Sequence, residues 1–247
     1  DRLTALFGWE PVTPTEIVLS DEVEVANGFS QSHPRNRLTL WITDPYEIES
    51  DVGVWLESLI VHEFTHTLHL DMASGAPLNL RSLFGRHPLL FPDQFQPAWL
   101  IEGIATFMET DSGRGIGRGQ SSYFDMLMRS EVLQGIKPLQ QVNQTLRTWP
   151  AGKAHYLYGV YFYKFLAERY GEPRLWSWLK RYRSHLIPFK INTNSKQEFG
   201  KDLLTLWDEF TLWLNARYQS QVAAVEAQGL QDGEIVTQHG YDTQGSV

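Results

Sequence analysis

The chain has 247 residues, of which 42% are hydrophobic and 20% charged, so it can bury one substantial core and is not expected to be disordered. Its formal charge is −8 and its 21 Lys and Arg residues are scattered, which argues against a nucleic-acid-binding protein. Cysteine is absent, which excludes thiolate metal sites, disulfide scaffolds and cysteine peptidases, and no apolar run is long enough for a transmembrane segment.

The N-terminal part of the chain predicts a small sheet followed by one helix. Strands are expected at Ile17–Leu19, Val23–Val25 and Arg37–Thr43, and the last of these alternates apolar and polar residues until Asp44-Pro45. Between residues 54 and 70 the apolar side chains recur every fourth position, which predicts an amphipathic helix.

The rest of the chain is expected to be mainly helical. Residues 73–97 are rich in glycine and proline and predict a long loop, and the glycine-rich residues 111–119 predict a mobile loop. Helices are expected at 97–109, 121–134, 153–170, 173–184 and 202–227. We therefore predict one α+β domain over 1–227, with a small N-terminal mixed sheet and the first long helix in 1–72, a helical lobe in 73–227, and a linker or tail at 228–247.

His62-Glu63-Phe64-Thr65-His66 lies in the middle of the first long helix. Two histidines four residues apart project from the same face of a helix, so both imidazoles can reach one zinc ion. Glu63 is adjacent to the first histidine and can accept a proton from the metal's water, as a general base does. The structural alternative is that the two histidines merely share a helix face.

A catalytic zinc usually needs a third protein ligand. His69 lies on the same helix face but one turn further along, and a straight helix does not easily bring three successive turns onto one ion. Glu102 and Glu109 are the only acids of an apolar helix, where an acid is costly unless it is paired or bound to a metal. We favour Glu102 as the ligand and expect Glu109 to support the site. A surface acid on an amphipathic helix is the alternative.

Both segments resemble the gluzincin metallopeptidases, a clan with thermolysin-like and aminopeptidase-like members. In this clan a His-Glu-x-x-His helix is followed by a second helix that supplies a glutamate ligand. The string Trp-Leu-Ile-Glu-Gly-Ile-Ala-Thr-Phe-Met-Glu at 99–109 is close to the second-helix motif. The resemblance implies a gluzincin-like fold, one Zn²⁺ per chain held by His62, His66 and Glu102, and peptide-bond hydrolysis with Glu63 as general base.

The longer context is similar to bacterial peptidases in which such a domain precedes a β-propeller of Tol-associated type. The matching strings are Ala26–Phe29, His62–Asp71, Phe84–Arg86 and Tyr156–Gly159. This resemblance implies that the chain is one domain of a longer extracytoplasmic protein, periplasmic or secreted. Its expected partners are a peptide or protein substrate and a C-terminal β-propeller.

The chain departs from the clan's pattern at two places. Thermolysin-type enzymes carry an Asp four residues after the ligand glutamate, where this chain has Thr106, so Asp71 is expected to accept the hydrogen bond of a zinc histidine instead. The Gly-x-Met-Glu-Asn segment of the aminopeptidase branch does not precede His62, which favours an endopeptidase. Two rival functions remain: a zinc-retaining binding or assembly module without turnover, and a zinc hydrolase of a non-peptide bond.

Tyrosines crowd the helix predicted at 153–170. Related peptidases have a tyrosine in a comparable helix that donates to the oxyanion, so Tyr156 is the first candidate and Tyr158 the second, with core packing as the alternative for each. A peptide substrate is expected to lie along an edge strand, for which residues 38–43 are the candidate unless that strand is simply buried.

Overall fold

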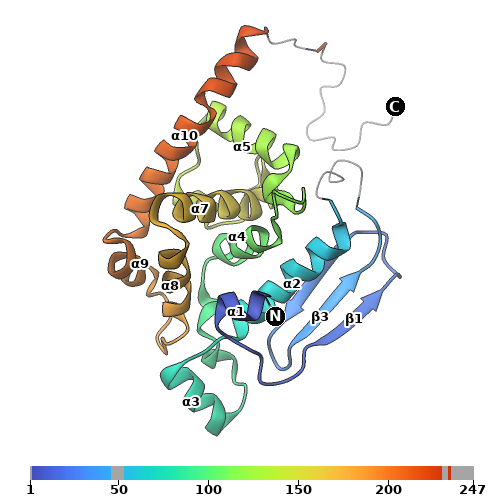
Figure 1. Ribbon diagram of the computed structural model, residues 1–247, viewed down its shortest axis with the longest axis vertical. Coiled ribbons are helices and arrows are strands. Elements are labelled where there is room, and N and C mark those ends of the chain that lie inside the picture. Colours follow the sequence, from blue (N-terminus) through green and yellow to red (C-terminus); the bar gives the residue numbers. More distant parts are fainter. Residues whose placement is uncertain (1, 46–52, 230–232, 235–247) are drawn as a thin grey trace.

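The computed structural model describes residues 2–45, 53–229 and 233–234. Within these ranges a small sheet packs against a larger helical body (Figure 1). The strands are β1 (Glu16–Ser20), β2 (Asn27–Gln31) and β3 (Arg37–Trp41). The longer helices are α2 (Trp55–Asp71), α3 (Gly75–Phe84), α4 (Ala98–Glu109), α5 (Ser122–Gln134), α7 (Ala154–Tyr170), α8 (Glu172–Tyr182), α9 (Ile191–Phe199) and α10 (Leu203–Ala227). Shorter pieces are α1 (Arg2–Phe7), α6 (Leu139–Val142), η2 (Pro88–Leu90), η3 (Pro92–Phe95), η4 (Arg118–Gln120) and η5 (Ala151–Lys153). The predicted α+β class with a small mixed sheet is confirmed.

β3 lies in the centre of the sheet. The strand order is β1-β3-β2, with β1 parallel and β2 antiparallel to β3. Leu38 and Leu40 of β3 point towards α2 and are buried with Leu59, which makes a small core between the sheet and this helix. The sheet is therefore covered on one face by the helix that carries the two candidate zinc histidines.

The prediction of a strand at Val23–Val25 is wrong, because the strand begins only at Asn27. Gly28 allows β2 to lie close against α2. A Cβ atom at this position would come within 3.0 Å of Leu59 and 3.2 Å of Glu63, so only glycine lets the strand approach α2 this closely. The alternation of apolar and polar residues in the sequence does not predict such a close approach of a strand to a helix.

The helices stack outward from the sheet in the order α2, α4 and α7 (Figure 1). The contact between α4 and α7 is close at a pair of glycines: a Cβ atom on Gly103 would lie 2.5 Å from the Gly159 Cα atom. Beyond this contact, an aromatic core joins α4, α7 and α10 through Trp99, Phe162, Trp207 and Phe210. None of the described helices is both long and apolar enough to cross a membrane.

The long loop predicted at residues 73–97 is instead largely helical. It contains α3 and the two 3-10 turns η2 and η3. Pro88 and Pro92 stand at the first positions of these turns, where the missing N–H costs nothing, so the prolines start helical turns rather than interrupt them. The short helices α1 and α6 and the helix α9 were not predicted. The predicted tail at 228–247 lies almost wholly outside the described residues.

Candidate metal centre

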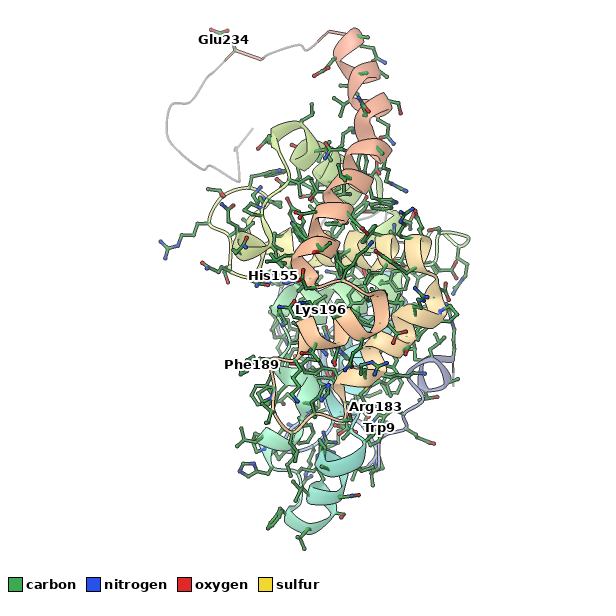
Figure 2. All side chains as sticks on the ribbon, turned by 90° about the vertical axis from the view of Figure 1, so that its left-hand side faces the viewer. Trp9, His155, Arg183, Phe189, Lys196 and Glu234 are labelled. Atoms are coloured by element: carbon green, nitrogen blue, oxygen red, sulfur yellow. The ribbon has the colours of Figure 1, made fainter. Side chains whose placement is uncertain are left out.

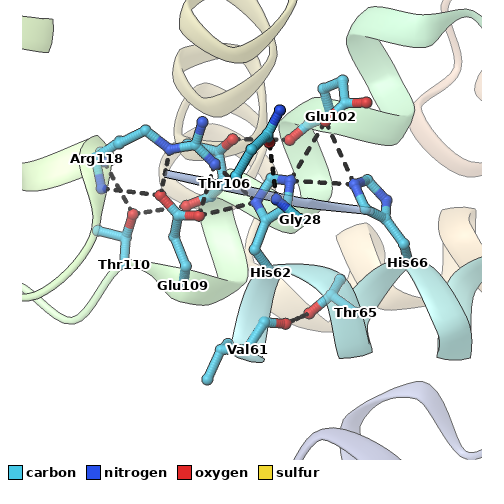
Figure 3. A network of polar contacts seen from close by, with 12 residues as sticks. Gly28, Val61, His62, Thr65, His66, Glu102, Thr106, Glu109, Thr110 and Arg118 are labelled. Carbon is cyan, nitrogen blue, oxygen red and sulfur yellow. Dashed lines mark hydrogen bonds and ion pairs between the residues drawn. The ribbon is translucent and has the colours of Figure 1, made fainter. Parts of the chain in front are cut away.

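Three side-chain atoms from α2 and α4 converge on one point (Figure 3). The Nε2 atoms of His62 and His66 are 3.1 Å apart, and each lies 3.3 Å from the Glu102 Oε2 atom. Tetrahedral zinc with bonds of about 2.0–2.1 Å holds its ligand atoms about 3.3–3.4 Å from one another. The triangle has the size of one face of such a tetrahedron, so these residues could hold a metal ion.

The protonation states of Glu102 and His66 suit a cation, whereas the pKa of His62 is raised. Burial and the nearby Arg118 would lower the pKa of His62, but its contacts with Glu102 and Glu109 outweigh both. Burial alone would raise the pKa of Glu102, but the two histidines beside it outweigh burial and hold the pKa well below its usual value. Burial is also the main reason that the pKa of His66 is lowered. A carboxylate and a neutral imidazole are the forms in which these side chains bind metals.

Glu109 fixes the orientation of His62. Its Oε2 atom lies 2.8 Å from Nδ1 of the imidazole and can accept the Nδ1–H of the tautomer whose Nε2 binds a metal; a terminal nitrogen of Arg118 also lies 2.9 Å from Nδ1. Arg118 holds the carboxylate in turn, with Nε 2.7 Å from Oε1 and a terminal nitrogen 2.8 Å from Oε2. Burial would raise the pKa of Glu109, but Arg118 outweighs it and lowers the pKa to about 2.

Asp71 does not have the role expected of it. Its carboxylate accepts a hydrogen bond from the Trp9 indole at 3.0 Å and pairs with Arg86 at 2.8 Å, at the far end of α2. His69 also lies apart from the cluster, with its Nε2 atom 3.6 Å from Asp93. Glu109, and not Asp71, is the carboxylate beside a candidate zinc histidine. It can reach His62 because it follows Glu102 by two helical turns and so lies on the same face of α4.

The role of Arg118 could not be predicted from the sequence. The glycine-rich loop that carries it is ordered by a bridge between Asp111 and Ile116 and ends in η4. Gly117 has φ of +86°, and a Cβ atom there would lie 2.4 Å from the Glu109 carbonyl oxygen. The glycines therefore allow the loop to fold tightly over the end of α4 and to place Arg118 on Glu109, whereas composition alone indicated only a mobile segment.

Glu63 lines a pocket of about 380 Å³ together with the three ligand residues. Burial is the main cause that raises the pKa of its carboxyl to about 7. Its Oε2 atom has no hydrogen-bond partner among the described residues. A carboxylate with this pKa and a free oxygen can accept a proton near neutral pH.

Of the two predicted oxyanion donors, only Tyr156 lies at the pocket. Its ring centroid is 6.0 Å from that of His62, and the Arg118 guanidinium lies 4.6 Å from the ring. Burial and the nearby Glu102 raise the pKa of Tyr156 to about 12, so it carries its proton at neutral pH. Tyr158 is fully buried and donates its hydroxyl hydrogen to Glu131. The structure does not bring Tyr158 into the site.

The strand beside the pocket is β2 rather than β3. β3 is hydrogen-bonded to a neighbour on each side, so the segment predicted at 38–43 is not an edge on which a peptide could pair. Among the described residues β2 pairs only with β3, and its residues Asn27, Gly28, Phe29 and Ser30 line the pocket. A free edge strand therefore borders the candidate ligands.

Comparisons of the chain with protein-family models, with curated proteins and with solved structures found no match.

Proposed function

We propose that the chain is a zinc-dependent peptidase with a gluzincin-like fold, acting as an endopeptidase. The observation that carries the proposal is the triangle of ligand atoms from His62, His66 and Glu102, which shares an open pocket with Glu63. Two imidazoles and a carboxylate are a ligand set found in catalytic zinc sites that leave one position open. A site that served structure alone would not need a proton acceptor beside it.

The chain's own residues account for the proton transfers that peptide hydrolysis requires. Zinc in this position would supply Lewis-acid chemistry at the substrate carbonyl and its attacking water. Glu63 takes a proton from that water and passes it to the leaving amine. Tyr156 donates a hydrogen bond to the oxygen on which negative charge develops.

The position of β2 supports an extended peptide as the substrate. An exposed edge strand can pair with a peptide backbone through main-chain hydrogen bonds, whatever the peptide's side chains are. The sequence resemblance also supports an extracytoplasmic location and a C-terminal β-propeller in a longer protein.

The proposal is tested by elemental analysis of the purified chain followed by digestion of a broad peptide library. We expect one zinc per chain, cleavage within peptides, and loss of both on chelation. Glu63→Gln should keep the zinc but lower the rate about 10²–10⁴-fold, because the amide cannot accept the proton. Glu57→Gln is the matched control, since Glu57 lies on the same helix in an exposed pair with Arg114.

The rival functions give different results in the same experiment. Zinc binding without cleavage of any peptide would favour a binding or assembly module. Failure to take up zinc after dialysis against it would reject both interpretations, and near-normal turnover of Glu63→Gln would reject Glu63 as the base.

A further inference from the structure

The side chain of Arg118 contacts groups from three helices of the candidate site. Its Nε atom lies 2.7 Å from Oε1 of Glu109 at the end of α4, and one terminal nitrogen lies 2.8 Å from Oε2 (Figure 3). The same terminal nitrogen is 2.9 Å from Nδ1 of His62 on α2. The guanidinium carbon lies 4.6 Å from the ring centroid of Tyr156 on α7. One side chain therefore touches both a candidate metal ligand and the candidate oxyanion donor.

The backbone that carries Arg118 is anchored to α4 and to α7. The N–H group of Arg118 donates to the Glu109 Oε1 atom at 3.0 Å, and that of Gly119 donates to the Thr110 hydroxyl at 3.1 Å. The Gly119 carbonyl oxygen accepts a hydrogen bond from the Lys164 ammonium of α7. A Cβ atom on Gly119 would lie 2.5 Å from the Thr110 Oγ1 atom and 2.9 Å from a valine methyl group of α7. The missing side chain thus lets η4 fit between the two helices and fixes where Arg118 begins.

The chemistry of an arginine suits these two contacts at once. Burial would lower the pKa of Arg118, but the Glu109 carboxylate outweighs burial and raises the pKa, so the guanidinium stays charged. A guanidinium is planar: it can grip a carboxylate with two N–H groups while its face lies against an aromatic ring. A lysine ammonium is a point charge without a plane and cannot reproduce both contacts.

Tyr156 is half-buried at the start of α7, where it lines the pocket. Its ring contacts the imidazole of His62, with 6.0 Å between centroids, and the guanidinium of Arg118. The neighbouring His155 (Figure 2) does not line the pocket, and its Nε2 atom lies 3.3 Å from the Gln144 carbonyl oxygen. Of these two adjacent side chains, the one at the pocket is therefore the one that Arg118 contacts.

We propose that Arg118 is a positioning residue that orients both His62, through Glu109, and the oxyanion donor Tyr156. His62 and Tyr156 belong to α2 and α7, and α4 lies between these two helices. A side chain that contacts both groups fixes the distance between a metal ligand and the hydroxyl that acts on the substrate. The role of Tyr156 rests on the proposed function, whereas the effect on the metal ligand does not require turnover.

Arg118→Lys tests the proposal, because it keeps the positive charge and loses the planar fork. Zinc affinity, measured by competition with a chelating dye, should fall about 10–100-fold. At saturating zinc, kcat should fall about 10–100-fold with little change in KM, because the donor is misplaced. The NMR ring signals of Tyr156 in ¹³C-tyrosine-labelled protein, assigned by comparison with Tyr156→Phe, should shift. Those of the buried Tyr158 should not. In a Glu109→Gln background, Arg118→Lys should weaken zinc binding little further, since both changes act through one contact.

Arg114→Lys is the matched control, because Arg114 lies in the same loop in an exposed pair with Glu57. It should leave zinc affinity, kcat and the ring signals unchanged. If Arg118→Lys does not fold, Arg118→Met combined with Glu109→Leu replaces both members of the buried pair, which proteins often tolerate, and should show the same three effects. Unchanged zinc affinity or unchanged Tyr156 signals in a folded variant would overturn the proposal. A native protein that binds zinc but cleaves no peptide would reject only the peptidase, since zinc affinity and the ring signals would still decide the role of Arg118.

Discussion

Tyr156 and Tyr158 are two residues apart on α7 but face different surroundings. Tyr156 lies at the pocket beside His62, whereas Tyr158 is buried with Glu131. This difference makes the pair a test of the proposed oxyanion donor in which each variant controls for the other.

We predict that Tyr156→Phe lowers kcat and kcat/KM together by about 10²–10³, with little change in KM. The zinc content and the melting temperature should hardly change, since the ring still fills its place. Tyr158→Phe should instead affect stability and not kinetics. It removes one of the two donors to the buried Glu131 carboxylate, the other being Lys137, and should lower the free energy of unfolding by about 1–3 kcal/mol at unchanged turnover. Normal kinetics for Tyr156→Phe would remove it from the mechanism.

Glu109 acts on the metal only through His62, so its effect should appear in zinc affinity. We predict that Glu109→Gln weakens zinc binding about 10–100-fold, because the amide is a poorer acceptor for the imidazole N–H and loses its charge pair with Arg118. Competition with a chelating dye measures this without any assay of activity. Glu57→Gln should leave the affinity unchanged, and an equal affinity in both variants would show that Glu109 does not position His62.

At the scale of elements, the approach of α4 to α7 determines where Glu102 lies. Glu102 is the neighbour of Gly103, which contacts Gly159 of α7. We predict that Gly103→Ala lowers the free energy of unfolding by about 1–3 kcal/mol, because the added methyl group overlaps the facing backbone. It should also weaken zinc binding, since the helices must move apart. Gly152→Ala is the control, as no atom lies within 4 Å of its added Cβ. Urea unfolding and zinc titration measure the two effects.

The helices that carry the candidate ligands could be predicted from the sequence almost to the residue. Apolar side chains at four-residue intervals specify α2, and a proline followed by an apolar run specifies α4. β2 and the Arg118 loop could not be predicted, because both depend on glycines that allow a close approach to a helix: Gly28 to α2, far away in sequence, and Gly117 to the end of α4. The position of Glu109 at the site could be predicted from the sequence, since residues seven apart, such as Glu102 and Glu109, lie on one helix face. The contact of Arg118 with Glu109 could not be predicted, because no local sequence pattern indicates it.

At the scale of the whole molecule, Asp71 joins three separate parts of the chain. It is buried at the end of α2, where it binds Trp9 from the N-terminal segment and Arg86 from the residues after α3. Arg86 also donates to the Pro34 carbonyl at 3.1 Å and to the Asn36 side chain at 2.8 Å, both in the turn between β2 and β3. This group of contacts therefore fixes the sheet to the helical body at the end of α2 away from the candidate metal ligands.

Removal of Arg86 should uncouple these parts and leave a buried carboxylate short of a partner. We predict that Arg86→Ala lowers the free energy of unfolding by about 3 kcal/mol, the lower end expected when one member of a buried ion pair is lost, because Asp71 keeps its contacts with Arg81 and Trp9. Arg35→Ala is the control, because its exposed pair with Glu16 should contribute only about 0–1 kcal/mol. Urea unfolding measures both. Zinc affinity of the folded Arg86→Ala protein should stay unchanged, since Asp71 does not contact the candidate ligands. A large loss of zinc affinity in a still-folded Arg86→Ala protein would mean that the Asp71 contacts, and not Glu109 alone, orient the metal histidines.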